Sequence, residues 1–253
     1  MTKNFGKNEE RTAEYLKQFN REKVLKRLIN QNNPIIFDIG ANNGSSLIEF
    51  KKWWPDSIIH CFEPQKECWE DLHTIQSEHE NDSIVVNKFA LGDSDTDAKE
   101  FFTHDLNSGI SGFNKINLKS KDSIDISTIQ NDKNKIKQHS ETINHSREVR
   151  LMRLDSYVSK VSLNNHISLM KIDTQGYEPE ILKGAGDFLK NVDIVLTELM
   201  FYDYYERSLS FSDIERYLHP AGLRLYDISH IAKNPMNGRT DWVDVIYVNK
   251  RVI

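Results

Sequence analysis

The stretch PIIFDIGANNG, residues 34–44, decides how the rest of the chain can be interpreted. Its apolar run, residues 35–37, is typical of a parallel strand that is buried on both faces. Asp38 follows the run, and Gly40 and Gly44 then allow a tight turn into a helix N-terminus. The stretch therefore predicts a ligand-binding loop at the carboxyl end of a strand.

Strands and helices alternate on the C-terminal side of this stretch. Further buried strands are predicted at residues 58–62, 84–89, 167–172 and 192–196. Helical spacing predicts helices at residues 45–54, 69–75, 177–189 and 212–218, the last opened by a capping box of Ser212 and Glu215. Residues 223–228 and 243–248 alternate and are expected to close the sheet as a pair. This order predicts a doubly wound α/β fold.

Two segments flank or interrupt the predicted sheet. Apolar residues at nearly helical spacing predict one amphipathic helix over residues 9–30, so residues 1–33 form an N-terminal helical extension and residues 34–253 the main domain. Extra strands are expected at 99–103 and 149–154, with a turn at 155–156. Residues 104–148 are polar, with isoleucines too sparse to build a core. They form either a functional lid or a disordered insertion.

Composition limits the function classes. The 253 residues suffice for one α/β core. A net charge of −5 gives no attraction to phosphate polymers or anionic membranes. Cys61 and Cys68 are expected to be free thiols, and the chain has neither a signal-type segment nor an apolar run of membrane-spanning length. A cytoplasmic protein without a membrane span is expected.

The residues at two strand ends indicate the ligand. Glu63 lies 19 residues beyond Gly44, the offset at which a carboxylate accepts the hydroxyl groups of a ribose. A dinucleotide loop has glycine where this chain has Asn42, and Asp38 would repel a pyrophosphate but attract an ammonium group. The site therefore favours S-adenosylmethionine over NAD, which argues against an oxidoreductase. A nucleotide site and a plain structural turn remain as alternatives.

Several blocks along the chain resemble the FkbM family of S-adenosylmethionine-dependent methyltransferases. These blocks are FDIGANNG (37–44), FEP (62–64), ALGD (90–93), RLDSY (153–157), KIDTQGYE (171–178) and LKGA (182–185). The resemblance implies a class I methyltransferase fold, with a mostly parallel seven-stranded sheet and an antiparallel last strand. It also implies methylation of hydroxyl oxygens on sugars or polyketide-like molecules. The polar stretch 113–147 departs from the family pattern.

The resemblance also implies roles for individual residues. The methionyl-binding loop would comprise Asp38, Gly40, Ala41, Asn42, Asn43 and Gly44. Glu63, followed by Pro64, would bind the ribose, and Leu91, Gly92 and Asp93 would contact the adenine edge. Ser108 and Ser111 resemble a serine-bearing loop near the site.

Methyl transfer to an alcohol requires a group that takes the hydroxyl proton. Asp173 is the first candidate, because it ends a strand expected beside residues 35–37, and it would also contact the cofactor. Glu198 is the second, and Glu178 and His230 are weaker. Asp173 can instead cap the next helix. Asp173 and Glu198 could hold a divalent cation, but two carboxylates are too few to infer a metal.

Two further questions stay open. The aromatic run 201–205 can stack on a sugar ring or simply pack. The acceptor is expected to be a glycan or another small molecule and not a nucleic acid, since residues after 30 carry a net charge of −9. An RNA methyltransferase and a catalytically silent cofactor-binding domain are the alternatives, although Glu63 and the glycine loop are both present. The sequence does not fix the oligomeric state.

Overall fold

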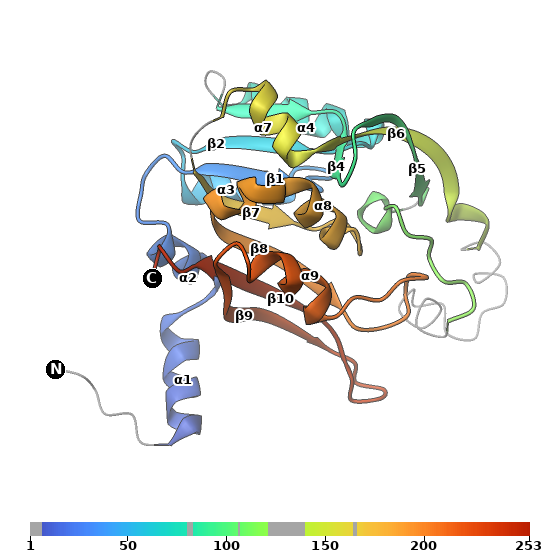
Figure 1. Cartoon of the computed structure of the whole chain (residues 1–253). Coiled ribbons are helices and arrows are strands. Elements are labelled where there is room, and N and C mark those ends of the chain that lie inside the picture. Colours follow the sequence, from blue (N-terminus) through green and yellow to red (C-terminus); the bar gives the residue numbers. More distant parts are fainter. Residues whose placement is uncertain (1–6, 80–82, 106, 121–139, 164–165) are drawn as a thin grey trace.

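The computed structural model describes residues 7–79, 83–105, 107–120, 140–163 and 166–253, and its centre is a mostly parallel sheet (Figure 1). Within those ranges seven strands follow the order β3-β2-β1-β7-β8-β10-β9. Only β10 runs antiparallel to its neighbours β8 and β9. The predicted class I methyltransferase topology is thus confirmed. The strands are β1 Ile35–Ile39, β2 Ile58–Phe62, β3 Ile84–Asn87, β7 Ile167–Ile172, β8 Val192–Met200, β9 Leu223–Lys233 and β10 Thr240–Asn249.

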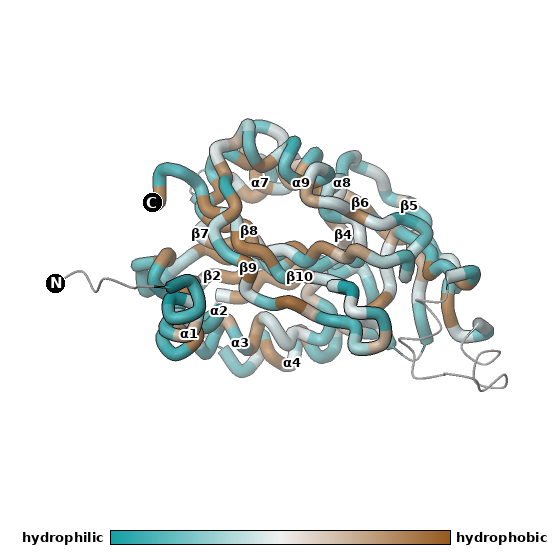
Figure 2. Tube along the Cα trace, turned by 90° about the horizontal axis from the view of Figure 1, so that it is seen from below, coloured by the Kyte–Doolittle hydropathy of each residue, from teal (hydrophilic) through white to brown (hydrophobic). Residues whose placement is uncertain are grey.

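Helices cover both faces of this sheet, and consecutive strand residues point to opposite faces. Ile36 packs among apolar residues of one helix set, whereas Phe37 packs among those of the other. Figure 2 shows the two sets on opposite sides of the apolar strands. The first set is α2 Arg21–Leu28, α3 Ser45–Trp53 and α4 Trp69–Ser77, and the second is α7 Leu154–Lys160, α8 Glu178–Ala185 and α9 Phe211–Leu218.

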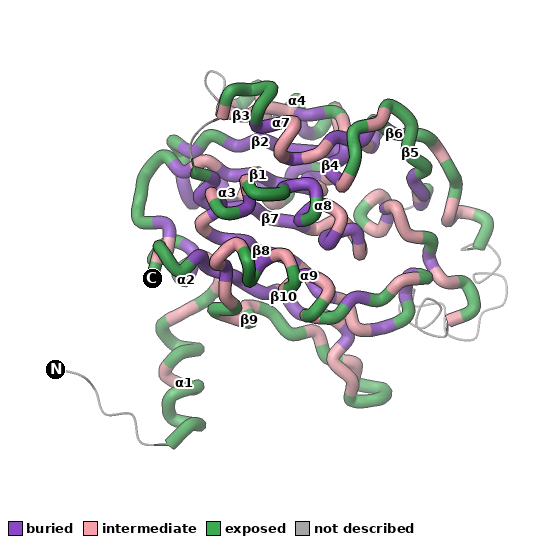
Figure 3. The backbone as a smooth tube through the Cα atoms, viewed as in Figure 1, coloured by how far each residue is buried: buried purple, intermediate pink, exposed green. Residues whose placement is uncertain are grey.

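The N-terminal segment is two helices, so the prediction of one helix over 9–30 is wrong. The helix α1 Asn8–Gln18 ends before Asn20, whose side chain accepts a hydrogen bond from the Lys23 N–H and so starts α2. Figure 3 shows α1 exposed along its length. Val24 and Leu25 of α2, in contrast, lie in the same apolar cluster as Ile36.

A second, smaller sheet lies beside the first. Its strands, β4 Ala90–Gly92, β6 His145–Arg153 and β5 Thr96–Thr103, neighbour one another in that order. The strand expected at 84–89 therefore divides, because β3 ends at Asn87 and Ala90 pairs with Leu151 of β6. The turn expected at 155–156 is the start of α7.

Other element boundaries also differ from expectation. The capping box of α9 is formed by Ser210 and Asp213, not by Ser212 and Glu215. The helix expected over 177–189 stops at Ala185, because Gly186 adopts φ +53°, and a 3-10 turn continues to Asn191.

Part of the polar insertion is packed. The 3-10 turn η2 Ser108–Ile110 begins it, and Ile116 and Ile143 are buried against three tyrosines of the segment after β8. The expectation that the isoleucines build no core is therefore wrong for these two. β6 already begins at His145, inside the range 104–148. Residues 121–139 lie outside the described residues.

Gly184 sets the distance between α8 and β4. A Cβ atom at this position would lie 1.8 Å from the Gly92 carbonyl oxygen, so backbone would have to move. We expect Gly184→Ala to lower the free energy of unfolding by about 3 kcal/mol, measured by denaturant titration. Lys183→Ala, an exposed change in the same helix, should leave the denaturant midpoint close to that of wild type. If Gly184→Ala and wild type unfolded at the same denaturant concentration, the close contact between Gly184 and the Gly92 carbonyl would be refuted.

Candidate active site

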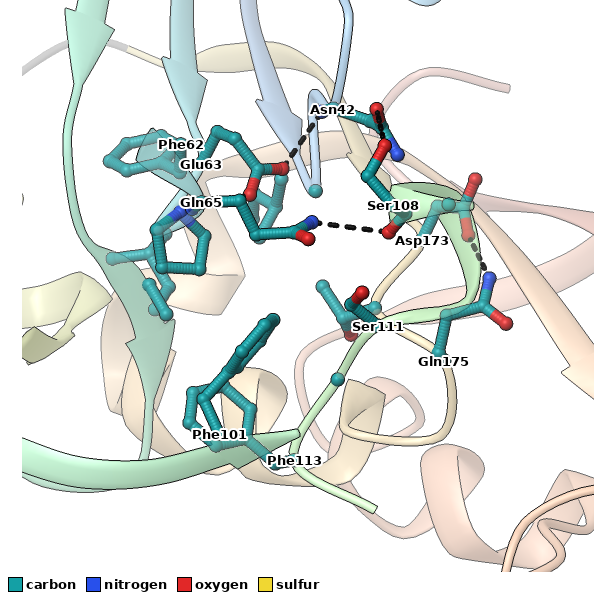
Figure 4. Close-up of a pocket in the computed structure, with 18 residues that line it drawn as sticks. Asn42, Phe62, Glu63, Gln65, Phe101, Ser108, Ser111, Phe113, Asp173 and Gln175 are labelled. Atoms are coloured by element: carbon teal, nitrogen blue, oxygen red, sulfur yellow. Dashed lines mark hydrogen bonds between the residues drawn. The ribbon is translucent and has the colours of Figure 1, made fainter. Parts of the chain in front are cut away.

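A pocket of about 610 Å³ opens at the carboxyl ends of β1, β2 and β4 (Figure 4). Its walls combine strand ends with the loop that carries Ser108 and Ser111 and with the loop after β7. The lining residues are Ile39, Gly40, Asn42, Phe62, Glu63, Pro64, Gln65, Ala90, Leu91, Phe101, Ser108, Gly109, Ser111, Gly112, Phe113, Asp173, Thr174 and Gln175.

The glycine loop lies directly against the strand that bears Asp173. Gly40 adopts φ +79°, and a Cβ atom there would lie 1.9 Å from the Asp173 carbonyl oxygen. The Gly40 and Ala41 N–H groups donate to the Phe62 carbonyl, at 3.0 and 3.2 Å. Asn42 is also left-handed, with φ 47°. Glycine at position 40 thus lets β1 and β7 approach closely at the pocket floor.

Glu63 presents a buried carboxylate to the pocket. Glu63 is only 2% exposed. Its two carboxylate oxygens accept hydrogen bonds from the Asn42 and Gln65 N–H groups, each at 2.8 Å. Burial raises the pKa of this carboxyl, and the two backbone hydrogen bonds oppose that rise. A carboxylate oxygen holds more than one lone pair, so the group can still accept from two ribose hydroxyls.

Apolar side chains form the wall beside Glu63. Phe62, Leu91, Phe101 and Phe113 offer faces against which a purine ring can pack. Of the predicted adenine edge, only Leu91 lines the pocket. Gly92 lies beneath Gly184, and Asp93 pairs with Lys183 at 2.8 Å.

Both predicted serines line the pocket. The Ser108 hydroxyl donates to Asn42 Oδ1 at 2.9 Å, and the Ser108 carbonyl accepts from Gln65 Nε2 at 3.2 Å (Figure 4). The Ser111 hydroxyl accepts from the His104 N–H at 3.1 Å. The two Ser108 bonds join the insertion to the loops after β1 and β2, whereas the Ser111 bond lies within the insertion.

Asp38 lies below the pocket instead of in its lining. It is fully buried, and one of its oxygens is 3.2 Å from Lys171 Nζ, which is also 3.5 Å from Asp173 Oδ2. Burial raises the pKa of Asp38 although Lys171 opposes the rise, and the two carboxylates raise the pKa of Lys171 despite its burial. Direct contact of Asp38 with an ammonium group stays a prediction.

Three more loop residues predicted to bind cofactor are not among the lining residues: Ala41, Asn43 and Gly44. Gly44 is the left-handed N-cap of α3, and Asn43 Oδ1 accepts from the Ser45 hydroxyl at 2.8 Å. These residues shape the turn. No role was predicted for Lys171 from the sequence, although it is the first residue of the KIDTQGYE block.

Asp173 separates the pocket from a second crevice. Its side chain is 40% exposed, and Oδ1 accepts a hydrogen bond from Gln175 Nε2 at 2.9 Å. It does not cap α8, whose N-cap residue is Tyr177. The crevice is lined by Arg21, Lys171, Ile172, Asp173, Leu196, Thr197, Glu198 and Asp244.

Glu198 lies in this crevice with an altered acidity. Burial first, and then the nearby charges of Asp173 and Asp244, raise its pKa to about 8. Arg21 of α2 reaches the same region, 3.7 Å from Asp244 and 2.6 Å from Glu49. A carboxyl group with a pKa near neutrality can exchange a proton at physiological pH.

The weaker catalytic candidates lie outside both cavities. Glu178 Oε1 accepts from the Thr174 N–H and hydroxyl, each at 3.0 Å, and from the Gly176 N–H at 3.3 Å, so it fixes the loop after β7. The sequence predicts a polar turn at His230, after the strand at 223–228, but the residue is exposed and lies within β9. Tyr202, Tyr204 and Tyr205 are buried, which assigns the aromatic run to packing.

Burial raises the pKa of Glu178 to about 7. Its protonated form therefore stabilises the fold fully below the unfolded pKa, and that stabilisation is lost as the pH rises through about 7. Glu178→Gln cannot ionise, so its stability relative to wild type should improve by roughly 2 kcal/mol between about pH 5 and pH 8. Denaturant unfolding at both pH values measures the difference in the free energy of unfolding between Glu178→Gln and wild type. The same difference at both pH values would contradict the prediction.

The described residues contain neither a cluster suited to a metal ion nor a helix suited to a membrane. Within the described ranges, no group of three or more His, Cys, Asp and Glu side chains is arranged to hold a metal ion. In the same part of the chain, no helix combines the length and apolar character that crossing a bilayer requires.

Comparisons with known proteins agree with this fold. The profile of a family described as the methyltransferase FkbM domain matches residues 38–225. The chain is 24% identical over 192 residues to the 2-O-methyltransferase NoeI of Sinorhizobium fredii, covering 72% of this chain and 70% of that protein. It is 24% identical over 170 residues to Methyltransferase 1 of Beauveria bassiana, covering 66% and 65% of the two. The second relative is thus matched over less than two thirds of its length.

Two solved structures illustrate the structural likeness. Magnesium protoporphyrin IX methyltransferase from Synechocystis PCC 6803 with bound S-adenosylmethionine has a TM-score of 0.46 at 8% identity, covering 90% of this chain and 77% of that one. Fibrillarin from Aeropyrum pernix has a TM-score of 0.43 at 11% identity, covering 93% and 74%.

Proposed function

Because the chain belongs to the FkbM family of S-adenosylmethionine-dependent methyltransferases, as its motifs predict, we propose that it methylates a hydroxyl oxygen of a sugar or glycan. One observation supports this most. Asp173 lines both the pocket that suits the cofactor and the crevice that holds Glu198. A hydroxyl in the crevice would therefore meet a carboxylate at the boundary between donor and acceptor.

The pocket residues fit S-adenosylmethionine. Glu63 is placed for the ribose hydroxyls, and the apolar wall around Leu91 and Phe101 is placed for the adenine. The bound cofactor supplies a methyl group already activated by a positively charged sulfur. The protein has to orient the acceptor and receive a proton.

Asp173 is the proposed general base. Lys171 and Gln175 each contact one of its oxygens, and lone pairs remain that can accept the hydroxyl hydrogen bond. Lys171 also pairs with the buried Asp38, so a fixed charge network lies beneath the base. Glu198, with its pKa raised to about 8, is largely protonated at neutral pH and can donate a hydrogen bond to a second acceptor oxygen.

A polyhydroxylated acceptor matches these groups. The crevice contains three carboxyl groups, Lys171 and Arg21, which together can pair with several hydroxyls. The relative from Sinorhizobium fredii is named a 2-O-methyltransferase, which is consistent with oxygen as the methylated atom. RNA is the alternative acceptor and is included in the test.

The test is transfer of labelled methyl from S-adenosylmethionine to a panel of glycans, nucleotide sugars, free sugars and RNA. The proposal predicts label on a sugar hydroxyl, located by mass spectrometry of the product. Label in RNA alone would overturn the acceptor assignment. Cofactor binding by calorimetry without transfer to any acceptor would favour the silent-domain alternative.

A further inference from the structure

Gln175 follows the candidate base in an unusual backbone conformation. It adopts φ 58°, which is uncommon for a residue with a side chain, and Gly176 continues with φ 91°. This turn directs the Gln175 amide back toward Asp173, where Nε2 donates to Oδ1 at 2.9 Å (Figure 4). Glu178 Oε1 stabilises the turn by accepting hydrogen bonds from the Thr174 and Gly176 N–H groups.

Tyr205 holds the other end of the same amide. The residue is 2% exposed, and its hydroxyl is 2.8 Å from Gln175 Oε1 and 2.9 Å from the Ile110 carbonyl oxygen. Because Nε2 donates to Asp173, the amide orientation places Oε1 toward the hydroxyl. The single hydroxyl hydrogen of Tyr205 is shared between these two acceptors, so Tyr205 lies between Gln175 and the loop that carries Ser108 and Ser111.

We propose that Gln175 and Tyr205 are positioning residues that hold the Asp173 carboxylate at the boundary between cofactor pocket and crevice. This inference rests on the proposed function of Asp173. Among the described residues, the Asp173 carboxylate is approached by Gln175 and also by Lys171, whose Nζ is 3.5 Å away and is itself paired with Asp38. Without Gln175, the half-exposed carboxylate would be drawn toward Lys171 and away from the acceptor.

The same contacts couple the base to the cofactor wall. The Ile110 carbonyl belongs to η2, and Ser108 in this turn is bonded to Asn42 and Gln65. The Tyr205 hydroxyl thus contacts both η2 and Gln175, and η2 is bonded to the ends of β1 and β2. We therefore expect the place of the base to depend on how η2 docks on these strands.

Gln175→Glu and Tyr205→Phe test the assignment. Both should lower kcat, by about 30-fold and about tenfold, while KM for S-adenosylmethionine changes less than about threefold. A glutamic acid donates a hydrogen bond to Asp173 only when protonated. The activity of Gln175→Glu relative to wild type should therefore rise as the pH falls from about 8 to about 5.5. A purely structural role predicts no such recovery.

Tyr204→Phe is the matched control, because Tyr204 is buried in the same aromatic cluster and lies outside both cavities. It should keep wild-type kcat. Thermal unfolding of all three variants distinguishes lost positioning from lost folding.

A second readout needs no acceptor. The carbon-13 carboxyl resonance of Asp173, assigned with Asp173→Asn, should move in Gln175→Glu and Tyr205→Phe but stay in place in Tyr204→Phe. An unmoved resonance in the first two variants would overturn the inference. A wild-type enzyme that methylates no hydroxyl, with the expected resonance shifts, would refute the proposed function alone.

Discussion

Asp173→Asn is expected to lower kcat for methyl transfer by about a thousandfold and to change the affinity for S-adenosylmethionine by less than about threefold. The amide keeps the shape of the side chain and can still accept from Gln175 Nε2. It cannot take up the hydroxyl proton, and its NH₂ group faces the Lys171 ammonium. The measurement is steady-state transfer of labelled methyl at saturating cofactor, with affinity determined by calorimetry.

Asp187→Asn is the control for this substitution. Asp187 is an exposed aspartate that pairs with Lys190 on the surface, remote from the lining of both cavities. Its variant should keep wild-type kcat. Wild-type rates in Asp173→Asn would exclude Asp173 as the base and leave Glu198 as the candidate.

Glu63→Gln is expected to weaken binding of S-adenosylmethionine by about 100-fold. The two Glu63 oxygens accept from the Asn42 and Gln65 N–H groups. The glutamine side chain would point its NH₂ group at one of these two backbone N–H groups. That buried N–H would then lose its hydrogen-bond acceptor. The negative charge that attracts the ribose hydroxyls would also disappear.

Calorimetry with S-adenosylmethionine and with S-adenosylhomocysteine measures this loss. Glu67→Gln, an exposed substitution four residues further along, should bind both ligands like wild type. Because the chemistry lies at Asp173, kcat of Glu63→Gln at saturating cofactor should stay within about threefold of wild type. Wild-type affinity in Glu63→Gln would remove Glu63 from the cofactor site.

Local patterns predicted the sheet because its parallel strands are short, mainly apolar runs, several of which end at a polar residue or a glycine turn. Ile35–Ile39 ends with the glycine loop, and Ile58–Phe62 is followed by Glu63. Helix limits were less predictable, since one side chain decides them. Asn20 is the N-cap of α2 although it lies inside a continuous helical pattern. The N-cap of α9 is Ser210, two residues before the predicted Ser212.

The parts of the site that escaped prediction depend on contacts between distant segments. In the sequence, Lys171 is an ordinary residue of a predicted strand. The pairing of β1 with β7 places its side chain between Asp38 and Asp173. Tyr205 lies 30 positions from Gln175, and Ile116 and Ile143 pack against the tyrosines of the segment after β8. No periodicity within one segment encodes such pairings.

In the proposed mechanism, a donor pocket and an acceptor crevice meet at Asp173. The most direct measurement is a crystal structure with S-adenosylhomocysteine and the glycan that accepts the methyl group. It should show the acceptor hydroxyl within hydrogen-bond distance of the Asp173 carboxylate, with the sugar between Lys171 and Glu198. A glycan bound instead beside Glu67 and Asn107, away from Asp173, would contradict the proposed role of Asp173.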